Sequence, residues 1–293
     1  MKSIKTNTIL SKHKYKNMWF NIDYIMNLYR GCCHGCIYCD ARSDCYQITD
    51  FDQVTVKENA ISILEKELKA TRNKGIIGIG SMSDTYNPFE KNQTITRQAL
   101  LLLARYGFGV SLVTKSDLIV RDIDVLKEIQ KHAPIICKLT ITTIDDTLSK
   151  KIEPNVCCSS NRFNALEKLT SEGIFSGIML MPILPYITDN EQQIISLIRR
   201  AHECGARFIY PAFGMTLRAN QRDYYYEQLD RIFPNLKEKY VQQYGDAYNC
   251  QAENSKKLYH IFVSECQKTG LLFQMKDIIA AYMQHTPQQL KLF

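Results

Sequence analysis

Three cysteines near the N-terminal end of the chain have the spacing expected for ligands of an iron–sulfur cluster. Cys32, Cys36 and Cys39 form a C-x3-C-x2-C pattern in one short stretch, in which Gly31 and Gly35 give the backbone freedom to turn. Such clusters usually use four cysteines, so three ligands leave one iron of a [4Fe–4S] cubane free to bind a cofactor or substrate. The spacing therefore predicts a cluster that takes part in catalysis.

Two other interpretations of this loop stay open at the level of sequence. Counted from Cys33, the spacing is C-x2-C-x2-C, but a ferredoxin-type run then needs a fourth cysteine followed by proline, where this chain has Ser43 and Asp44. That electron-carrier interpretation requires Cys45 as a substitute. A structural zinc site usually pairs two separated C-x-x-C knuckles, and the sequence has no second, distant one. The ligands of such a zinc site would come from Cys32, Cys33, His34, Cys36, Cys39 and Cys45.

Short apolar runs alternate with amphipathic segments along the first two thirds of the chain. This alternation predicts an α/β fold with parallel strands joined by right-handed crossovers, either an open doubly wound sheet or a partial or full barrel. In these folds the loops after the strands build the site, and the cysteines follow the first predicted strand. The expected strands lie at 25–29, 75–81, 108–114, 135–143, 176–184 and 206–213, and the expected helices at 57–72, 94–105, 121–131, 160–172 and 189–204.

After residue 214 the alternation gives way to a helical segment rich in tyrosine and lysine. We expect an N-terminal segment at 1–20, a β/α core at 21–214, a helical C-terminal extension at 215–284 and a flexible tail at 285–293. No apolar stretch approaches the roughly 20 residues of a membrane span, and the first residues are polar, which predicts a cytoplasmic protein without membrane contact. The remaining cysteines are expected to be buried, inert thiols: Cys137, Cys157, Cys158, Cys204, Cys250 and Cys266.

The cysteine pattern after the first strand of a six-fold β/α chain resembles that of the radical SAM enzymes. Within that superfamily, the stretches LYRGCCHGCIYCDAR, GSMSDTYNPFEK, LVTKSDLIVRD, LTITT, IEPN and MLMPILP resemble the spore photoproduct lyase-like group of DNA repair enzymes over roughly residues 20–215. The resemblance implies a partial (β/α)6 barrel, a [4Fe–4S] cluster on Cys32, Cys36 and Cys39, and S-adenosylmethionine bound to the free iron. Reduction by an electron donor would then give a 5′-deoxyadenosyl radical.

The resemblance also implies a set of residues around S-adenosylmethionine. It places Tyr38 beside the cofactor, Ser83, Asp84 and Lys115 at its methionyl end, and Thr140 and Met181 along the remainder. An anion and a cation at the ends of two strands suit a zwitterionic methionyl group. On sequence alone, solvation is the more common explanation for Asp84 and Lys115, and packing is the more common one for Thr140 and Met181.

Two further observations limit how far the resemblance extends. The repair lyase returns a hydrogen atom from a cysteine a few residues before the Ser-Asp pair, where this chain has Ser81, and a serine O–H bond is too strong for that step. Tyr86 is better explained as an aromatic residue beside a turn than as a residue that relays this hydrogen atom.

Glu153 and Arg162 are expected to pair near the adenosyl group, with a surface ion pair as the alternative.

Partners are indicated by the C-terminus and by the charge of the chain. Gln289, Leu290, Leu292 and Phe293 resemble the Q-L-x-L-F peptide that docks bacterial DNA enzymes on the sliding clamp. A net charge of +7 fits contact with nucleic acid and fits an ordinary basic protein equally well. The helical extension offers a stacking and phosphate-binding surface, with inward packing of its tyrosines as the alternative; the residues concerned are Arg218, Arg222, Tyr224, Tyr225, Tyr226 and Lys237.

Three functions follow from these patterns. The leading hypothesis is a lyase-like radical enzyme that acts on DNA or another nucleic acid, in a repair-like role. The second keeps the radical chemistry and assigns a peptide, protein or small-molecule substrate, because Ser81 replaces the hydrogen-donor cysteine. The third is a non-enzymatic nucleic-acid-binding protein with a structural metal.

Overall fold

Six parallel strands form the centre of the molecule in the computed structural model, which describes residues 1–13 and 18–284. The sheet has the order β10-β9-β8-β7-β6-β3-β2, in which only the edge strand β2 (Leu10–Lys12) pairs antiparallel. Since β10 and β2 lie at its two ends, the described sheet is an open, partial (β/α)6 barrel, as predicted. The parallel strands are β3 (Tyr24–Met26), β6 (Ile76–Ile79), β7 (Gly109–Thr114), β8 (Ile135–Thr140), β9 (Ser176–Leu180) and β10 (Phe208–Pro211).

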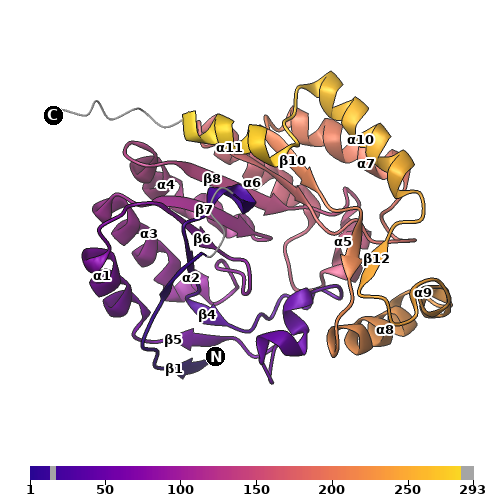
Figure 1. The fold of residues 1–293 in the computed structure, drawn as a ribbon, viewed down its shortest axis with the longest axis horizontal. Coiled ribbons are helices and arrows are strands. Elements are labelled where there is room, and N and C mark those ends of the chain that lie inside the picture. Colours follow the sequence, from indigo (N-terminus) through magenta and orange to yellow (C-terminus); the bar gives the residue numbers. More distant parts are fainter. Residues whose placement is uncertain (14–17, 285–293) are drawn as a thin grey trace.

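Amphipathic helices cover the outside of this sheet, and neighbouring helices α1, α3 and α4 pack side by side (Figure 1). Every residue of β6, β8 and β9 is buried, which is typical of parallel strands covered on both faces. No helix in the described ranges combines the length and the apolar character that crossing a membrane would require. The helices up to the end of the barrel are α1 (Ala60–Ala70), α2 (Glu90–Gln93), α3 (Ile95–Tyr106), α4 (Ile123–Gln130), α5 (Asp146–Ile152), α6 (Ser159–Ser171) and α7 (Glu191–Glu203).

The first predicted strand, at 25–29, is divided between two sheets. Residues 24–26 form β3 of the barrel, but Tyr29–Arg30 form β4 of a separate sheet with the order β1-β5-β4. In that sheet β4 pairs antiparallel with β5 (Thr55–Lys57), and β5 pairs parallel with β1 (Lys2–Ile4). The expectation that the cysteines directly follow a barrel strand was therefore wrong, because the chain leaves the barrel and pairs elsewhere first.

The segment after residue 214 is mainly helical, as expected, and carries a two-stranded antiparallel pair. Helix α10 packs along α7, and α11 contacts β8 and the short 3-10 turn η1 (Trp19–Asn21). Helix α8 lies beside the region that carries the cysteines, and α9 packs against α8 (Figure 1). The elements are β11 (Gly214–Thr216), α8 (Gln221–Ile232), α9 (Leu236–Tyr244), β12 (Asn249–Gln251), α10 (Ser255–Thr269) and α11 (Met275–Gln284). The domain boundaries stay a prediction.

Gly80, at the end of β6, offers a test of how tightly β6 and β7 pack. Its φ is +93°, and a Cβ placed there would lie 2.1 Å from the carbonyl oxygen of Val113. Gly107 has a similar φ of +72° with no atom within 4 Å of such a Cβ. We expect Gly107→Ala to lower the free energy of unfolding by about 1–2 kcal/mol through backbone strain. Gly80→Ala should lower it by about 1–3 kcal/mol more, because its side chain would also overpack the contact with Val113. Urea unfolding of both variants measures the difference, and equal losses would contradict tight packing.

Candidate active site

The three cysteines lie in a loop between β4 and the first of two 3-10 turns, η2 (Asp40–Arg42) and η3 (Asp44–Tyr46). Cys32 and Cys36 are buried and Cys39 is half-buried. Gly31 and Gly35 adopt left-handed φ values of +75° and +69°. Because side chains there would be strained, glycine suits both of these turns in the cysteine loop.

Burial and neighbouring charges act in opposite directions on the pKa values of the three thiols. Burial raises the pKa of Cys36 well above its usual range and that of Cys39 to about 11, while the charge of Lys115 acts in the opposite direction on both. For Cys32, burial raises the pKa, but His34 lowers it, and the net shift is downward. Since metal ligands must be thiolates, a cluster held here would supply positive charge that the protein alone provides only in part.

A mononuclear zinc site and a [4Fe–4S] cubane require different arrangements of the cysteine thiols. Among residues 1–13 and 18–284, no three His, Cys, Asp or Glu side chains converge where a single metal ion could bind. A zinc knot needs four ligands around one ion. In a [4Fe–4S] cubane each cysteine binds a different iron, so the thiols need not converge on one point.

Ser83 and Asp84, predicted to meet the methionyl group, hold neighbouring parts of the site together. The hydroxyl of Ser83 donates to the carbonyl oxygen of Gly31 at 2.5 Å. The carboxylate of Asp84 accepts from the hydroxyl of Thr114 at 2.6 Å and from the backbone N–H of Lys115 at 2.8 Å. Both side chains therefore tie the loop after β6 to the cysteine loop or to the end of β7, and their contact with the cofactor stays a prediction.

His34 is a part of the site that the sequence presented only as an alternative zinc ligand. It is buried, and its Nδ1 lies 3.6 Å from the Oδ2 of Asp84. Burial lowers the pKa of His34, but Asp84 and Cys32 raise it, and the net shift is upward. His34 thus joins the cysteine loop to the carboxylate at the end of β6. Its place between two cysteines of the motif was the available signal.

The other predicted cofactor residues lie at the carboxyl ends of neighbouring strands, where a parallel barrel gathers its functional groups. Lys115 follows β7, with its Nζ 5.6 Å from the centre of the Tyr38 ring. Burial lowers the pKa of Lys115, but Cys36 and Glu153 raise it, and the net shift is upward. Thr140 ends β8 and is buried, and the half-buried Met181 follows β9. The topology thus brings these residues to one edge of the sheet.

Glu153 and Arg162 form a fully buried ion pair, so the surface-pair alternative was wrong. Both side chains are 0 % exposed. Arg162 also donates to the carbonyl oxygen of Thr140 at 2.8 Å and to the hydroxyl of Ser149 at 2.7 Å. Glu153 accepts a further hydrogen bond from the hydroxyl of Tyr38. Burial raises the pKa of Glu153, but Arg162 and Lys115 lower it, and the net shift is downward.

Lys138, inside the apolar strand β8, was missed by the sequence interpretation. It is 2 % exposed, its Nζ donates to the hydroxyl of Ser111 at 2.5 Å, and it lies 4.3 Å from the centre of the Phe20 ring. Burial lowers its pKa to about 7. By strand alternation it shares a face with Ile136 and Thr140, and a lysine in an otherwise apolar strand was the signal that pointed to it.

Ser81 and Tyr86 differ in their access to solvent. Ser81 is exposed in the loop after β6, whereas Tyr86 is buried in the main core. The position of Tyr86 agrees with a packing role.

The predicted stacking surface on α8 and α9 does not form as proposed. Each of its cations has a protein partner: Arg218 donates to Tyr248, Arg222 pairs with Asp246, and Lys237 pairs with Asp230. Tyr225 is buried and Tyr226 packs against the same secondary core. The third tyrosine, Tyr224, contacts a cation of the cysteine loop region.

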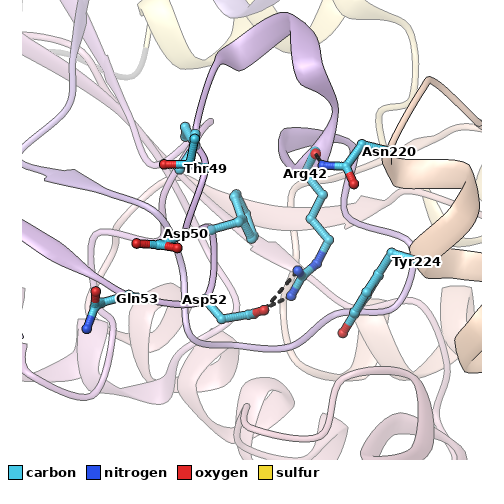
Figure 2. Close-up of a pocket in the computed structure, with 9 residues that line it drawn as sticks. Arg42, Thr49, Asp50, Asp52, Gln53, Asn220 and Tyr224 are labelled. Atoms are coloured by element: carbon cyan, nitrogen blue, oxygen red, sulfur yellow. Dashed lines mark hydrogen bonds and ion pairs between the residues drawn. The ribbon is translucent and has the colours of Figure 1, made fainter.

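Arg42 and Tyr224, the two residues of that contact, line a pocket of about 500 Å³ on the α8 side of the cysteine loop (Figure 2). The guanidinium of Arg42 lies 3.7 Å from the centre of the Tyr224 ring and 4.8 Å from that of Phe51, and it pairs with Asp52. The pocket is also lined by Asp50 and by several polar residues, including Thr49, Gln53 and Asn220. None of its lining residues belongs to the predicted cofactor set.

Comparison with known proteins adds the family. The sequence profile of the radical SAM superfamily matches residues 26–198. The chain belongs to the radical SAM superfamily. Enzymes of this superfamily use a [4Fe–4S] cluster and S-adenosylmethionine, and these are the cofactors of this chain.

Sequence relatives and solved structures agree with this membership. An uncharacterized protein of Mycobacterium tuberculosis is 28% identical over 228 residues, which cover 75% of this chain and 67% of that protein. An uncharacterized protein of Methanocaldococcus jannaschii is 37% identical over 171 residues, covering 57% and 63%. The structure of a spore photoproduct lyase mutant has a TM-score of 0.67 and 13% identity, covering 93% of this chain and 81% of the lyase. The radical SAM methyltransferase TsrM from Kitasatospora setae has a TM-score of 0.53 and 10% identity, covering 84% and 51%.

Proposed function

We propose that this radical SAM enzyme binds its [4Fe–4S] cluster through Cys32, Cys36 and Cys39 and acts on nucleic acid in a lyase-like repair reaction. The observation that supports the cluster assignment is the position of the three cysteines in one short loop, with Cys36 and Cys39 near enough to Lys115 for its charge to act on both. Held by these three cysteines, the reduced cluster with S-adenosylmethionine would supply the chemistry of a 5′-deoxyadenosyl radical. A cluster with three protein ligands has the free iron that such a reaction needs.

The residues around the loop have distinct tasks in this proposal. Lys115 carries the positive charge that attracts the carboxylate of the cofactor. Ser83 and Asp84 keep the cysteine loop and the end of β7 in place, while Thr140 and Met181 line the rest of the cofactor site.

The nucleic-acid part of the proposal is supported by a second pocket and by the fold relative. Spore photoproduct lyase has been solved with a dinucleoside spore photoproduct. In this chain a pocket of about 550 Å³ between the cysteine loop, α5 and α8 is lined by Tyr224 and by two cations, Lys151 and Arg231. The carboxylates of Asp52 and Glu227 also line it, so its charge is mixed. Lys151 and Arg231 make no ion pair within the described ranges. The aromatic ring can stack on a base, and the two cations can contact the phosphates beside it.

A double variant, Lys151→Gln with Arg231→Gln, tests this pocket. Binding of a fluorescein-labelled single-stranded oligonucleotide is measured by anisotropy over a range of salt concentrations. Each lost phosphate contact lowers the slope of log K against log salt by about 0.7, so we expect a decrease of about 1 to 1.5. The exposed pair Lys66→Gln with Lys256→Gln is the charge-matched control and should leave the slope unchanged. Equal slopes in all three proteins would contradict the assignment of the pocket.

A peptide, protein or small-molecule substrate is the second candidate function. The pocket of Figure 2 contains Asp50 and Asp52, and an adjoining pocket contains Asp44 and Asp223. Carboxylates repel phosphates and favour cationic groups. Ser81 in place of a hydrogen-donor cysteine supports the same candidate. Absence of oligonucleotide binding by the wild-type chain would favour it. The non-enzymatic hypothesis is not retained, since the superfamily consists of enzymes.

The remaining partners stay predictions. Gln289, Leu290, Leu292 and Phe293, the residues proposed to bind the sliding clamp, lie outside the described residues. The electron donor and the cytoplasmic location rest on the sequence interpretation alone.

A further inference from the structure

The segment Ile152–Asn155, which begins at the last residue of α5, makes a set of direct hydrogen bonds to the cysteine loop. The backbone N–H of Ile37 donates to the carbonyl oxygen of Ile152 at 3.0 Å, and the N–H of Asn155 donates to that of His34 at 3.1 Å. The side-chain amide of Asn155 donates to the carbonyl oxygen of Cys33 at 2.9 Å. Three backbone positions of the loop, 33, 34 and 37, are thus fixed by one four-residue segment.

The approach between the two segments is close at Gly35. A Cβ placed on Gly35 would lie 3.1 Å from both the Nδ2 of Asn155 and the Cγ of Pro154. A side chain at this position would push the loop away from the segment, in addition to the strain at its positive φ. Because Gly35 has no side chain, it leaves the space that the close approach of Pro154 and Asn155 requires.

A chain of buried polar contacts links this segment to the barrel. Arg162 binds the carbonyl oxygen of Thr140 at the end of β8 and pairs with Glu153, and Glu153 accepts from the hydroxyl of Tyr38, which lies between two of the cysteines. The carboxylate is 0 % exposed, so its charge is poorly screened by solvent. Lys115 is electrostatically coupled to both Glu153 and Cys36.

We propose that Ile152–Asn155 is a platform that positions the cysteine loop, and that the Glu153 carboxylate supplies a buried negative charge near the cysteines and so tunes the reduction potential of the [4Fe–4S] cluster that they would hold. The proposal rests on the assignment of Cys32, Cys36 and Cys39 as ligands. Hydrogen bonding and net charge around a cluster are main determinants of its potential. A buried negative charge disfavours the addition of an electron, and the Arg162 and Tyr38 contacts partly offset it.

Redox titration of the reconstituted protein, followed by electron paramagnetic resonance, tests the charge. Glu153→Gln removes the charge and leaves Arg162 uncompensated, so the midpoint potential should shift to more positive values. Tyr38→Phe removes the hydrogen bond that offsets the carboxylate, so the potential should shift to more negative values. A general loosening of the fold is not expected to shift the midpoint potential in opposite directions in these two variants. Tyr38→Phe also tests the proposal if Glu153→Gln folds poorly.

Asp52→Asn is the matched control, because this carboxylate also pairs with an arginine near the loop but its side chain is 63% exposed. It should leave the potential unchanged. Asn155→Ala tests the platform separately, and we expect a loss of bound iron and faster bleaching in air than in wild type. Wild-type potential in both Glu153→Gln and Tyr38→Phe overturns the role of the charge, and wild-type iron retention in Asn155→Ala overturns the platform. If the wild-type chain itself binds no [4Fe–4S] cluster, the ligand assignment fails instead.

Discussion

Replacing Cys36 with alanine is expected to abolish the formation of 5′-deoxyadenosine and to remove most of the bound iron. Cys36 is the middle ligand of the proposed set, buried beside Lys115, and no fourth protein thiolate is expected to replace it. The measurement is anaerobic reconstitution with iron and sulfide, followed by iron analysis, a visible absorption spectrum and detection of 5′-deoxyadenosine after reduction with S-adenosylmethionine.

Two further cysteine variants make this result specific. Cys33→Ala should keep both the cluster and the activity, because Cys33 belongs only to the ferredoxin-type spacing. Cys137→Ala should also keep them, because Cys137 is buried in β8, on the face that packs in the main core. Cys36 and Cys39 belong to both spacings, so loss of the cluster in Cys33→Ala with retention in Cys32→Ala would show that the ligands were assigned in the wrong register.

The barrel could be predicted from the sequence because its signals are local. Strands such as β8 are continuous apolar runs, and each is followed by an amphipathic helix, which together indicate a parallel sheet with covered faces. The same sequence pattern put Asp84 and Lys115 after neighbouring strands, and the structure brings them into hydrogen-bonding contact. Spacing along the chain was sufficient here because parallel strands all end at the same edge.

Features that depend on distant partners could not be predicted in the same way. The two residues of β4 leave the barrel because they pair with β5, about 25 positions later, and strands this short carry little preference of their own. The pairing of Glu153 with Arg162 was expected, but its burial was not. Burial arises because the cysteine loop, α5 and α6 enclose both side chains, and none of these contacts is visible in the segment itself.

Replacing Arg162 with methionine is expected to lower the free energy of unfolding by about 3–5 kcal/mol. The substitution leaves the Glu153 carboxylate buried without its cation, and it also removes the hydrogen bonds from Arg162 to Thr140 and Ser149. An isolated charge in a site without solvent contact is far more costly than a paired one. Urea unfolding of the protein before reconstitution measures the loss without a contribution from the cluster.

The double variant Arg162→Met with Glu153→Gln separates charge from packing. It carries no buried charge at these positions, so we expect it to be clearly more stable than Arg162→Met alone, although it loses the same arginine hydrogen bonds. A coupling energy of more than about 0.5 kcal/mol between the two substitutions identifies a direct interaction. If the two losses simply add, the stability of this region depends on the packing of Arg162 and not on its charge. The buried pair would then still link the cysteine loop to β8, but through shape and hydrogen bonds.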